Sequence, residues 1–328
     1  MKIAVRTGTC AAATILLLSA CSTNGQTEPA AAGTETDSAA AAYPVTVTSC
    51  GVDYTYDTAP ERVLLGAPGA IATLDALGVA DSAIGYTNGS YAFDGIDRFP
   101  GLTSNTEDYA PSREFLIGAS PDLFLSNDEG QLGGQGSASP DDLSTAGGNL
   151  YVLGEYCSNS PAPTTIDAVY TDVEHLGTIY GVPDEAAEVV TSLRDRVTAA
   201  RAKNTGTAPL SAAVVQSFDG KLYALSGSYY SAVVDALGMT NEFADIDGNF
   251  AEITPEAALN AAPDVVLVQY AGSDADADAA VTEISALLAN SPAVQNSRVY
   301  PQNEADFQAA GVRIVDAIEN TADNVFGK

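Results

Sequence analysis

The sequence predicts an α/β fold in which two similar α/β lobes are joined by one long, rigid helix. Three observations support this fold class. Short apolar runs alternate with helical stretches along most of the chain, as in proteins built on parallel sheets. Two amphipathic helices interrupt that alternation near the middle, and two short sequences of the first half recur in the second. With 46% hydrophobic residues, a chain of 328 residues can bury a substantial core.

Residues 1–20 are expected to be a lipoprotein signal peptide. Lys2 and Arg6 precede an apolar run, and Leu18-Ser19-Ala20-Cys21 resembles a lipobox, in which the Cys21 thiol can carry a diacylglyceryl group. A transmembrane helix is the alternative, but the interval between Arg6 and Cys21 is shorter than the roughly 20 apolar residues needed. We therefore expect an extracytoplasmic protein that is held at the cell membrane by a lipid anchor.

Charge narrows the range of partners. The chain carries 13 Lys and Arg against 43 Asp and Glu, a net charge of −30, and such a surface repels the phosphates of nucleic acid. The same field repels anionic lipid headgroups, so any membrane attachment has to be covalent. Residues 21–42 are rich in Ala, Thr and Gly without an apolar period, which predicts a disordered tether.

The four cysteines divide into three roles. Cys10 leaves with the signal peptide and Cys21 is acylated, which leaves Cys50 and Cys157 as an even pair in an oxidising compartment. We expect a disulfide between Cys50, ahead of the first strand, and Cys157, after the strand over 150–153. Two buried free thiols are the alternative.

Residues 43–182 are expected to form the N-terminal lobe. Its short apolar runs are typical of buried strands in a parallel sheet. The strands are expected over residues 62–65, 83–86, 122–125 and 150–153.

Two helices follow. Residues 166–180 carry apolar side chains at helical spacing, and Pro183 opens a second helix with the same spacing through Lys203. Residues 183–206 are therefore expected to be the interlobe helix.

Residues 207–328 are expected to form the C-terminal lobe, in which the alternation of strands and helices resumes. Strands are expected over residues 212–216, 264–269 and 298–300, and a closing helix over 307–326.

The second half repeats features of the first. Asp75-Ala76-Leu77-Gly78-Val79 recurs as Asp235-Ala236-Leu237-Gly238-Met239. In both halves a glutamate also stands seven positions before a Pro-Asp pair and a buried strand: Glu114 before Pro121, and Glu256 before Pro263. Two repeats in the same order predict two similar lobes, and the cleft between them is the expected ligand site.

This order of features resembles the substrate-binding proteins of ABC importers for ferric siderophores, haem and cobalamin. The resemblance covers about Val45 to the C-terminus and depends on Ala59-Pro60-Glu61-Arg62-Val63, Asp75-Ala76-Leu77-Gly78, the two Pro-Asp strand entries and Gly311-Val312-Arg313. It implies a monomeric binding protein, not an enzyme, that delivers its solute to ABC permease subunits.

The resemblance also assigns a role to two glutamates. Family members carry one glutamate per lobe that docks on permease arginines, and Glu114 and Glu256 occupy those positions. A local role is the alternative: Ser112 or Thr254 caps the helix, and the acid lies at the positive end of the helix dipole. The two roles are compatible.

The ligand is expected to contact loops at the carboxyl ends of the strands. Aromatic side chains are frequent there, and Phe250 matches a cleft tryptophan of relatives, although this chain has no tryptophan. The candidate ligand-binding residues are Tyr86, Tyr91, Tyr109, Tyr229, Tyr230, Phe250 and Tyr270, with Arg98, Arg113 and Arg313 as candidate cations. For each aromatic residue, simple packing in a loop is the alternative.

These side chains suit a large, part-polar chelate, because tyrosine offers a flat apolar face and a phenol hydrogen bond. With the strongly negative charge, we expect a neutral or cationic ferric hydroxamate siderophore in preference to an anionic catecholate. Haem and cobalamin remain as alternatives. Iron would enter only within the ferric chelate, with no covalent cofactor and no metal site in the protein.

Other function classes find less support. His175, the single histidine, falls on the polar face of its helix and is expected to be exposed, which argues against serine–histidine catalysis and histidine-rich metal sites. An extracytoplasmic hydrolase would need a defined pair of acids, and the acids are too many and too scattered to nominate one. A lipid-anchored sensor module of the same fold would differ only in its partner.

Overall fold

The computed structural model describes residues 43–89, 95–102, 109–134, 136–155, 157, 165–206, 208–246, 248–308 and 311–327, all within the unit Ala40–Lys328. The predicted signal peptide, the lipidation site Cys21, the tether and the candidate Tyr91 lie outside these residues. Within the described part of the chain, no helix is both long and apolar enough to cross a membrane.

The N-terminal lobe is built on a parallel sheet of four strands in the order β4-β3-β5-β6. The central strands β3 and β5 are buried along their whole length, as expected for a parallel sheet covered on both faces. The strands are β3 (Val63–Leu65), β4 (Ala83–Tyr86), β5 (Leu123–Ser126) and β6 (Asn149–Val152), and the helices are α1 (Ile71–Ala76), α2 (Arg113–Ala119) and α3 (Pro140–Thr145).

An antiparallel hairpin of β1 (Val45–Ser49) and β2 (Val52–Tyr56) precedes this sheet. Its turn contains Cys50, which forms a disulfide with Cys157, the two Cα atoms lying 5.3 Å apart. The pairing agrees with the sequence prediction, but Cys50 follows the first strand, where the sequence placed it before. The hairpin was missed because its alternation is confined to five-residue strands with few apolar side chains.

The C-terminal lobe has a mixed six-stranded sheet with the path β10-β8-β7-β11-β12 and β9 paired to β7. The predicted parallel rhythm holds for β7, β9, β11 and β12, whereas β8 and β10 run antiparallel to their neighbours. Its strands are β7 (Ser211–Phe218), β8 (Lys221–Leu225), β9 (Thr240–Asn241), β10 (Phe250–Ile253), β11 (Val265–Tyr270) and β12 (Val299–Asn303).

Helices α6 (Ser228–Ala236), α7 (Pro255–Ala261), α8 (Asp274–Leu287) and α9 (Pro292–Gln295) belong to the same lobe. The predicted closing helix over 307–326 was wrong in one respect, because it is divided into α10 (Glu304–Gln308) and α11 (Arg313–Phe326). Gly311 lies in the division with a φ of +63°, a left-handed conformation that glycine adopts without the steric penalty of a side chain.

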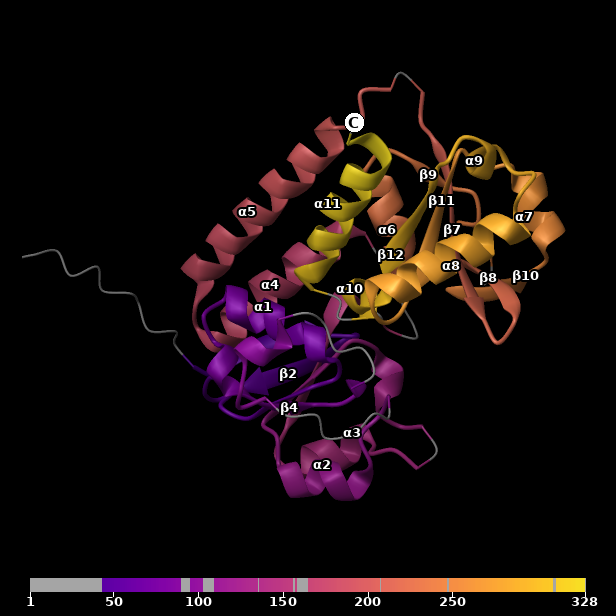
Figure 1. Ribbon diagram of the computed structural model, residues 1–328. Helices are drawn as coiled ribbons and strands as arrows, with labels where there is room; N and C mark the ends of the chain where they lie inside the picture. Colours follow the sequence, from indigo (N-terminus) through magenta and orange to yellow (C-terminus); the bar gives the residue numbers. More distant parts are fainter. Residues whose placement is uncertain are drawn as a thin grey trace, which may run out of the picture. The chain divides into compact units, whose positions relative to one another are not determined.

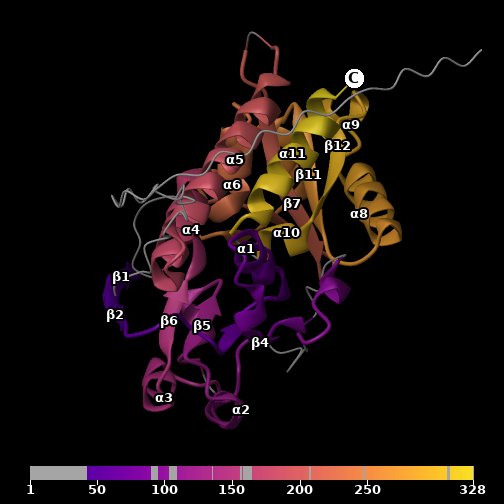
Figure 2. The same cartoon turned by 90° about the vertical axis from the view of Figure 1, so that its left-hand side faces the viewer.

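Two long helices connect the sheets. α4 (Ile166–Tyr180) and α5 (Pro183–Ala202) end within one residue of the stretches with helical spacing, although the interlobe helix was expected to reach residue 206. α5 packs against both α4 and α11. Figures 1 and 2 show α5 running from the N-terminal lobe to the C-terminal lobe. Arg196 of α5 forms ion pairs with Asp316 at 2.6 Å and Glu319 at 2.5 Å, which fasten it to α11.

The largest hydrophobic core belongs to both lobes. Each sheet turns one face into it, so that Leu65 and Leu125 of one sheet share a buried cluster with Val214 and Leu267 of the other. The opposite faces form separate outer clusters, one around Phe124 and one beneath α7, α8 and α9. The two sheets are therefore parts of one packed body.

The repeats of the sequence correspond to repeated structure. α2 and α7 both begin with a capping hydroxyl, since Ser112 Oγ accepts from Phe115 N and Thr254 Oγ1 from Ala257 N, each at 3.2 Å. Both helices end at a residue in the left-handed region, Ser120 and Ala262.

The aspartate of each Pro-Asp pair then fastens the turn to the adjacent strand of its sheet. The Asp122 carboxylate accepts from the backbone N of Arg62 at 3.0 Å, just before β3, and Asp264 accepts from Ser211 N at 3.0 Å, at the start of β7. The same helix, turn and strand unit therefore occurs once in each lobe, as the sequence predicted.

Candidate ligand-binding site

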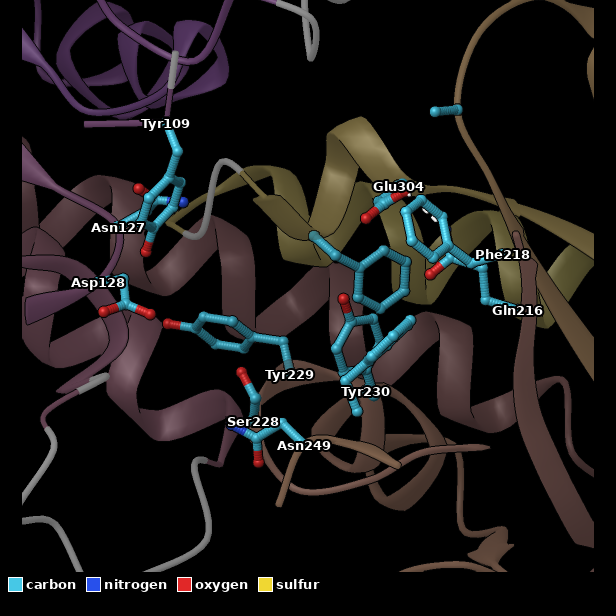
Figure 3. Close-up of a pocket in the computed structure, with 13 residues that line it drawn as sticks. Tyr109, Asn127, Asp128, Gln216, Phe218, Ser228, Tyr229, Tyr230, Asn249 and Glu304 are labelled. Atoms are coloured by element: carbon cyan, nitrogen blue, oxygen red, sulfur yellow. Dashed lines mark hydrogen bonds between the residues drawn. The ribbon is translucent and has the colours of Figure 1, made fainter. Parts of the chain in front are cut away.

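A cavity of about 500 Å³ lies between residues of the two lobes (Figure 3). Its volume is within the range of small-molecule sites, roughly 300–1,000 Å³. Tyr109, Asn127 and Asp128 line it from the N-terminal lobe. The C-terminal lobe contributes Gln216, Phe218, Ser228, Tyr229, Tyr230, Asn249, Phe250, Ala271, Glu304 and Phe307.

The N-terminal wall lies at the carboxyl end of β5, directly after its last residue. A buried glutamine, Gln131, holds this wall: its Nε2 donates to the carbonyl oxygens of Gly66 and Tyr109, each at 2.8 Å. Its Oε1 accepts from Asn127 N at 3.2 Å. This one side chain thereby joins the ends of β3 and β5 to the segment around Tyr109. Cβ of any residue replacing Gly66 would lie 2.1 Å from Gln131 Oε1, so a larger residue there would displace the Gln131 amide from these hydrogen bonds.

Asp128 places a carboxylate on this wall. Burial raises its pKa, while hydrogen bonds from the Gly130 backbone and from the Tyr109 side chain act in the opposite direction. Because the raised pKa reflects loss of water around the carboxylate, a cation that reaches Asp128 would interact with it more strongly than in bulk solvent.

The C-terminal wall combines a second carboxylate with aromatic rings. Glu304, at the start of α10, accepts from Gln216 Nε2 at 2.9 Å. Tyr230 stacks on Phe307, with ring centroids 5.2 Å apart and an angle of 14° between the planes. Figure 3 shows Glu304, Gln216 and Tyr230 across the cavity from Asn127 and Asp128.

Tyr229 connects the two walls. Its side chain is 3% exposed, and its phenol points toward Asp128 in Figure 3. A Cβ at Gly154, in the segment after β6, would lie 2.2 Å from the Tyr229 oxygen, so the ring of one lobe rests on glycine backbone of the other. The Gly154 backbone N in turn donates to the carboxylate of the buried Asp172 at 2.6 Å.

His175 belongs to the same region, and the prediction that it is exposed was wrong. Its Nδ1 lies 3.0 Å from the hydroxyl of Tyr151, which also donates to Asp172 Oδ1 at 2.9 Å, and the ring is half-buried. The error arose because helical periodicity places His175 on the polar face of α4 but does not show that Tyr151 of β6 reaches that face.

The structure brings together four of the residues that the sequence nominated as ligand contacts: Tyr109, Tyr229, Tyr230 and Phe250. Tyr86 instead is buried in the common core, with 8% of its surface exposed. Tyr270 lines a neighbouring cavity of about 210 Å³, which Phe307 borders as well.

The three candidate cations do not line the main cavity. Arg98 pairs with Asp75 at 2.9 Å, Arg113 with Asp142 at 2.7 Å, and Arg313 with Asp306. In a chain with this excess of acids, each of these arginines has an acidic partner within its own lobe.

Sequence reasoning missed several lining residues. Asn127 and Asp128 directly follow β5, and Glu304 directly follows β12, so the carboxyl-end rule could have found them had it been applied to polar residues as well as aromatic ones. Gln216 and Phe218 lie within β7 and carry no comparable signal. Among the described residues, no group of three or more His, Cys, Asp or Glu could hold a metal ion.

Glu114 and Glu256 are both exposed, in the first turns of α2 and α7. They occupy the same position of the repeated unit in the two lobes, away from the residues that line the cavity.

Comparison with known proteins identifies relatives of this chain and of its fold. The family model described as periplasmic binding protein matches residues 66–304. The ABC-type Fe3+-hydroxamate transport system of Saccharomonospora viridis is 30% identical, with a TM-score of 0.71 over 86% of this chain and 99% of that one. A periplasmic binding protein from Veillonella parvula has a TM-score of 0.75 at 18% identity, over 87% of this chain and 98% of that one.

A curated relative, the cobalamin-binding protein of Halobacterium salinarum, is 26% identical over 249 residues. The match takes in 75% of this chain and 62% of the relative's length. The matched family model spans most of the described residues of both lobes. The chain therefore belongs to the periplasmic binding protein family, which consists of substrate-binding proteins of ABC transporters and not of enzymes.

Proposed function

We propose that the protein captures a ferric siderophore of the neutral or cationic hydroxamate type and delivers it to the permease of an ABC importer. The observation that carries the proposal is the chemistry of the cavity: its described lining residues include two carboxylates, Asp128 and Glu304, and no lysine or arginine. A negatively charged catecholate complex would meet like charge there, whereas a cationic complex would meet opposite charge.

The remaining lining residues suit the same ligand. The rings of Tyr230 and Phe250 offer flat apolar contact, and the amides of Asn127 and Asn249 can donate to carbonyl or hydroxamate oxygens. Iron is cargo in this proposal and remains coordinated by the siderophore. The resemblance to a Fe3+-hydroxamate transport system at 30% identity supports the same ligand class.

Cobalamin is the second candidate, because a curated relative at 26% identity carries that name. Haem is less compatible with the cavity, because its two propionates would meet Asp128 and Glu304 without a cationic side chain among the described lining residues.

Calorimetric titration of the full protein tests the proposal. The ligands are a cationic ferric trihydroxamate, a ferric tricatecholate, haem and cobalamin. We expect one-to-one binding of the trihydroxamate, with the tricatecholate weaker by about 100-fold or more, a difference of roughly 2.7 kcal/mol. Preferred binding of the tricatecholate contradicts the charge argument, and preferred binding of cobalamin replaces the proposal by the second candidate.

We further propose that Cys21 carries the lipid anchor. Cys21→Ala should release the protein from the membrane fraction and abolish labelling by a fatty-acid analogue, because the acidic body has no affinity of its own for anionic headgroups. Cys10→Ala is the matched control and should leave labelling unchanged. Continued labelling of the Cys21 variant contradicts this part of the proposal.

A further inference from the structure

An aromatic surface continues from the cavity onto the outer strands of the C-terminal sheet. In the pairing of β7 with β8, Gln216 lies opposite Tyr223, and in the pairing of β8 with β10, Glu252 lies opposite Tyr223. Because side chains alternate between the two faces of a sheet, Phe218, two residues after Gln216, and Phe250, two before Glu252, share the face of Tyr223. We call Phe218, Tyr223 and Phe250 the aromatic shelf.

The three rings contact one another. Tyr223 and Phe250 are stacked, with centroids 4.2 Å apart and an interplanar angle of 14°. Phe218 meets both edge-on, at 6.4 Å from Tyr223 and 6.5 Å from Phe250. Further along the same face this sheet is covered, since Val214 and Leu225 are fully buried in the common core. The shelf is thus the uncovered end of a face that is otherwise packed.

The shelf is also unusually exposed for its composition. Phe218 is 61% exposed and Phe250 46%, although both could have been polar without loss of core packing. An ion pair between Lys221 and Glu252, at 2.6 Å, borders the shelf on its outer side. On its inner side the shelf is continuous with the cavity, because two of its residues, Phe218 and Phe250, also line the cavity.

We infer that the aromatic shelf is a specificity-determining subsite, which contacts an apolar or aromatic substituent of the bound chelate that extends beyond the cavity. The inference rests on the proposed function. It adds a contact surface for the part of the ligand that the cavity does not enclose. Continuity with the cavity favours the ligand as occupant over a separate protein partner. A flat substituent placed on these rings gains stacking contacts that a small one cannot make.

Two ferric trihydroxamates with the same charge and the same iron-binding groups provide the test. In one the terminal amine carries a benzoyl group, and in the other an acetyl group. We expect Phe218→Ala to weaken binding of the benzoyl complex by about 5- to 10-fold and of the acetyl complex by less than about 2-fold in calorimetric titration. Because Phe218 is largely exposed, this truncation leaves the core intact. Val52→Ala, on an exposed residue of β2, is the control and should change neither affinity.

A second variant uses the absence of tryptophan from the chain. Phe218→Trp retains an aromatic ring and gives the protein a single tryptophan, whose emission reports on the shelf. With gallium(III) in place of iron, so that the complexes do not absorb the emission, we expect a blue shift with the benzoyl complex and none with the acetyl complex.

The outcomes separate the two proposals. If the wild-type protein binds both chelates and Phe218→Ala weakens both equally, or weakens neither, the inference about the shelf is wrong. The proposed function is unaffected by that result. Impaired uptake by Phe218→Ala with unchanged affinity for both chelates also overturns it and identifies the shelf as a contact with the permease. Absence of binding of any ferric chelate by the wild-type protein overturns both.

Discussion

Gln131 shows how one side chain determines the position of several others at the cavity. Its amide joins the ends of two strands and the segment that carries Tyr109, and it has no exposed surface. A glutamine in a loop between Gly130 and a leucine has no distinguishing feature in the sequence, which is why sequence reasoning could find the aromatic residues of the site but not the residue that holds them.

Gln131→Ala should lower the free energy of unfolding by about 2 kcal/mol, because it leaves the carbonyls of Gly66 and Tyr109 and the N–H of Asn127 without their buried partner. Affinity for the chelate should fall as well, since Asn127 and Tyr109 lose their support. Chemical denaturation and titration measure the two effects. Gln295→Ala, on an exposed residue of α9, is the matched control. A stable variant with normal affinity would show that Gln131 does not position the wall.

Asp128 should make binding of a cationic chelate dependent on pH. Burial raises its pKa, so the carboxylate that attracts the cation forms only as the pH rises through an interval above the ordinary aspartate range. The stability of the free protein should change with pH in the direction opposite to the affinity. Because the folded state holds the Asp128 proton more tightly than the unfolded state does, the free energy of unfolding decreases as the pH rises through that interval. We expect affinity to increase with pH there in the wild type and to be flat in Asp128→Asn. Identical profiles for the two proteins would exclude Asp128 as the charged contact.

At the scale of elements, periodicity predicted the long helices well and the short strands poorly. α4 and α5 were found nearly to the residue because their apolar stripes extend over many turns. β8 and β10 were missed because they have only five and four residues. In addition, positive φ values at Asp219 and Gly220 allow a two-residue turn between β7 and β8, where a helical crossover was expected. The break before α11 lies at Gly311, which packs closely against Thr73 of the other lobe. A contact between residues so far apart in the sequence leaves no local pattern from which the break could be predicted.

The repeated unit gives a prediction at this scale. Asp122→Ala and Asp264→Ala should each destabilise the protein by about 1 kcal/mol or more. The first removes the acceptor for the backbone N–H groups of Glu61 and Arg62, and the second removes the acceptor for the backbone N–H of Ser211. Thermal or chemical denaturation measures the loss, with Asp57→Ala, an exposed residue after β2, as control. A large loss for one variant and none for the other would show that the two units are alike in shape but not in energetics.

At the scale of the whole molecule, the two lobes share one core, and backbone of one lobe closely approaches the other at two places among the described residues. One is Tyr229 on Gly154. In the other, Thr73 Oγ1 of α1 accepts from Val312 N at 3.2 Å, and a Cβ at Gly311 would lie 2.2 Å from the same oxygen. The sequence predicted two lobes and a connecting helix, but contacts between residues so far apart in the chain could not be inferred from local patterns.

The outer surface of each lobe is expected to bind the permease through one glutamate. If Glu114 and Glu256 pair with permease arginines, the double variant Glu114→Lys/Glu256→Lys should abolish uptake of the iron chelate while its affinity stays within about 2-fold of the wild type, because neither residue lines the cavity. Uptake by cells and titration of the purified protein are measured separately. Exchanging the exposed Glu188 of α5 and Glu242 after β9 for lysine gives a control with the same change in charge. Normal uptake by the first variant would leave both glutamates with their role at the helix start alone.

The Cys50–Cys157 disulfide determines what a single cut by an extracellular protease does to the protein. It closes a covalent ring that contains all four strands of the N-terminal sheet. A protease that cuts any single peptide bond between Cys50 and Cys157 opens the ring but releases no fragment, whereas one cut in the segment between α5 and β7 divides the chain into two pieces. The N-terminal half of the binding site can thus be nicked once and still remain one molecule with the rest.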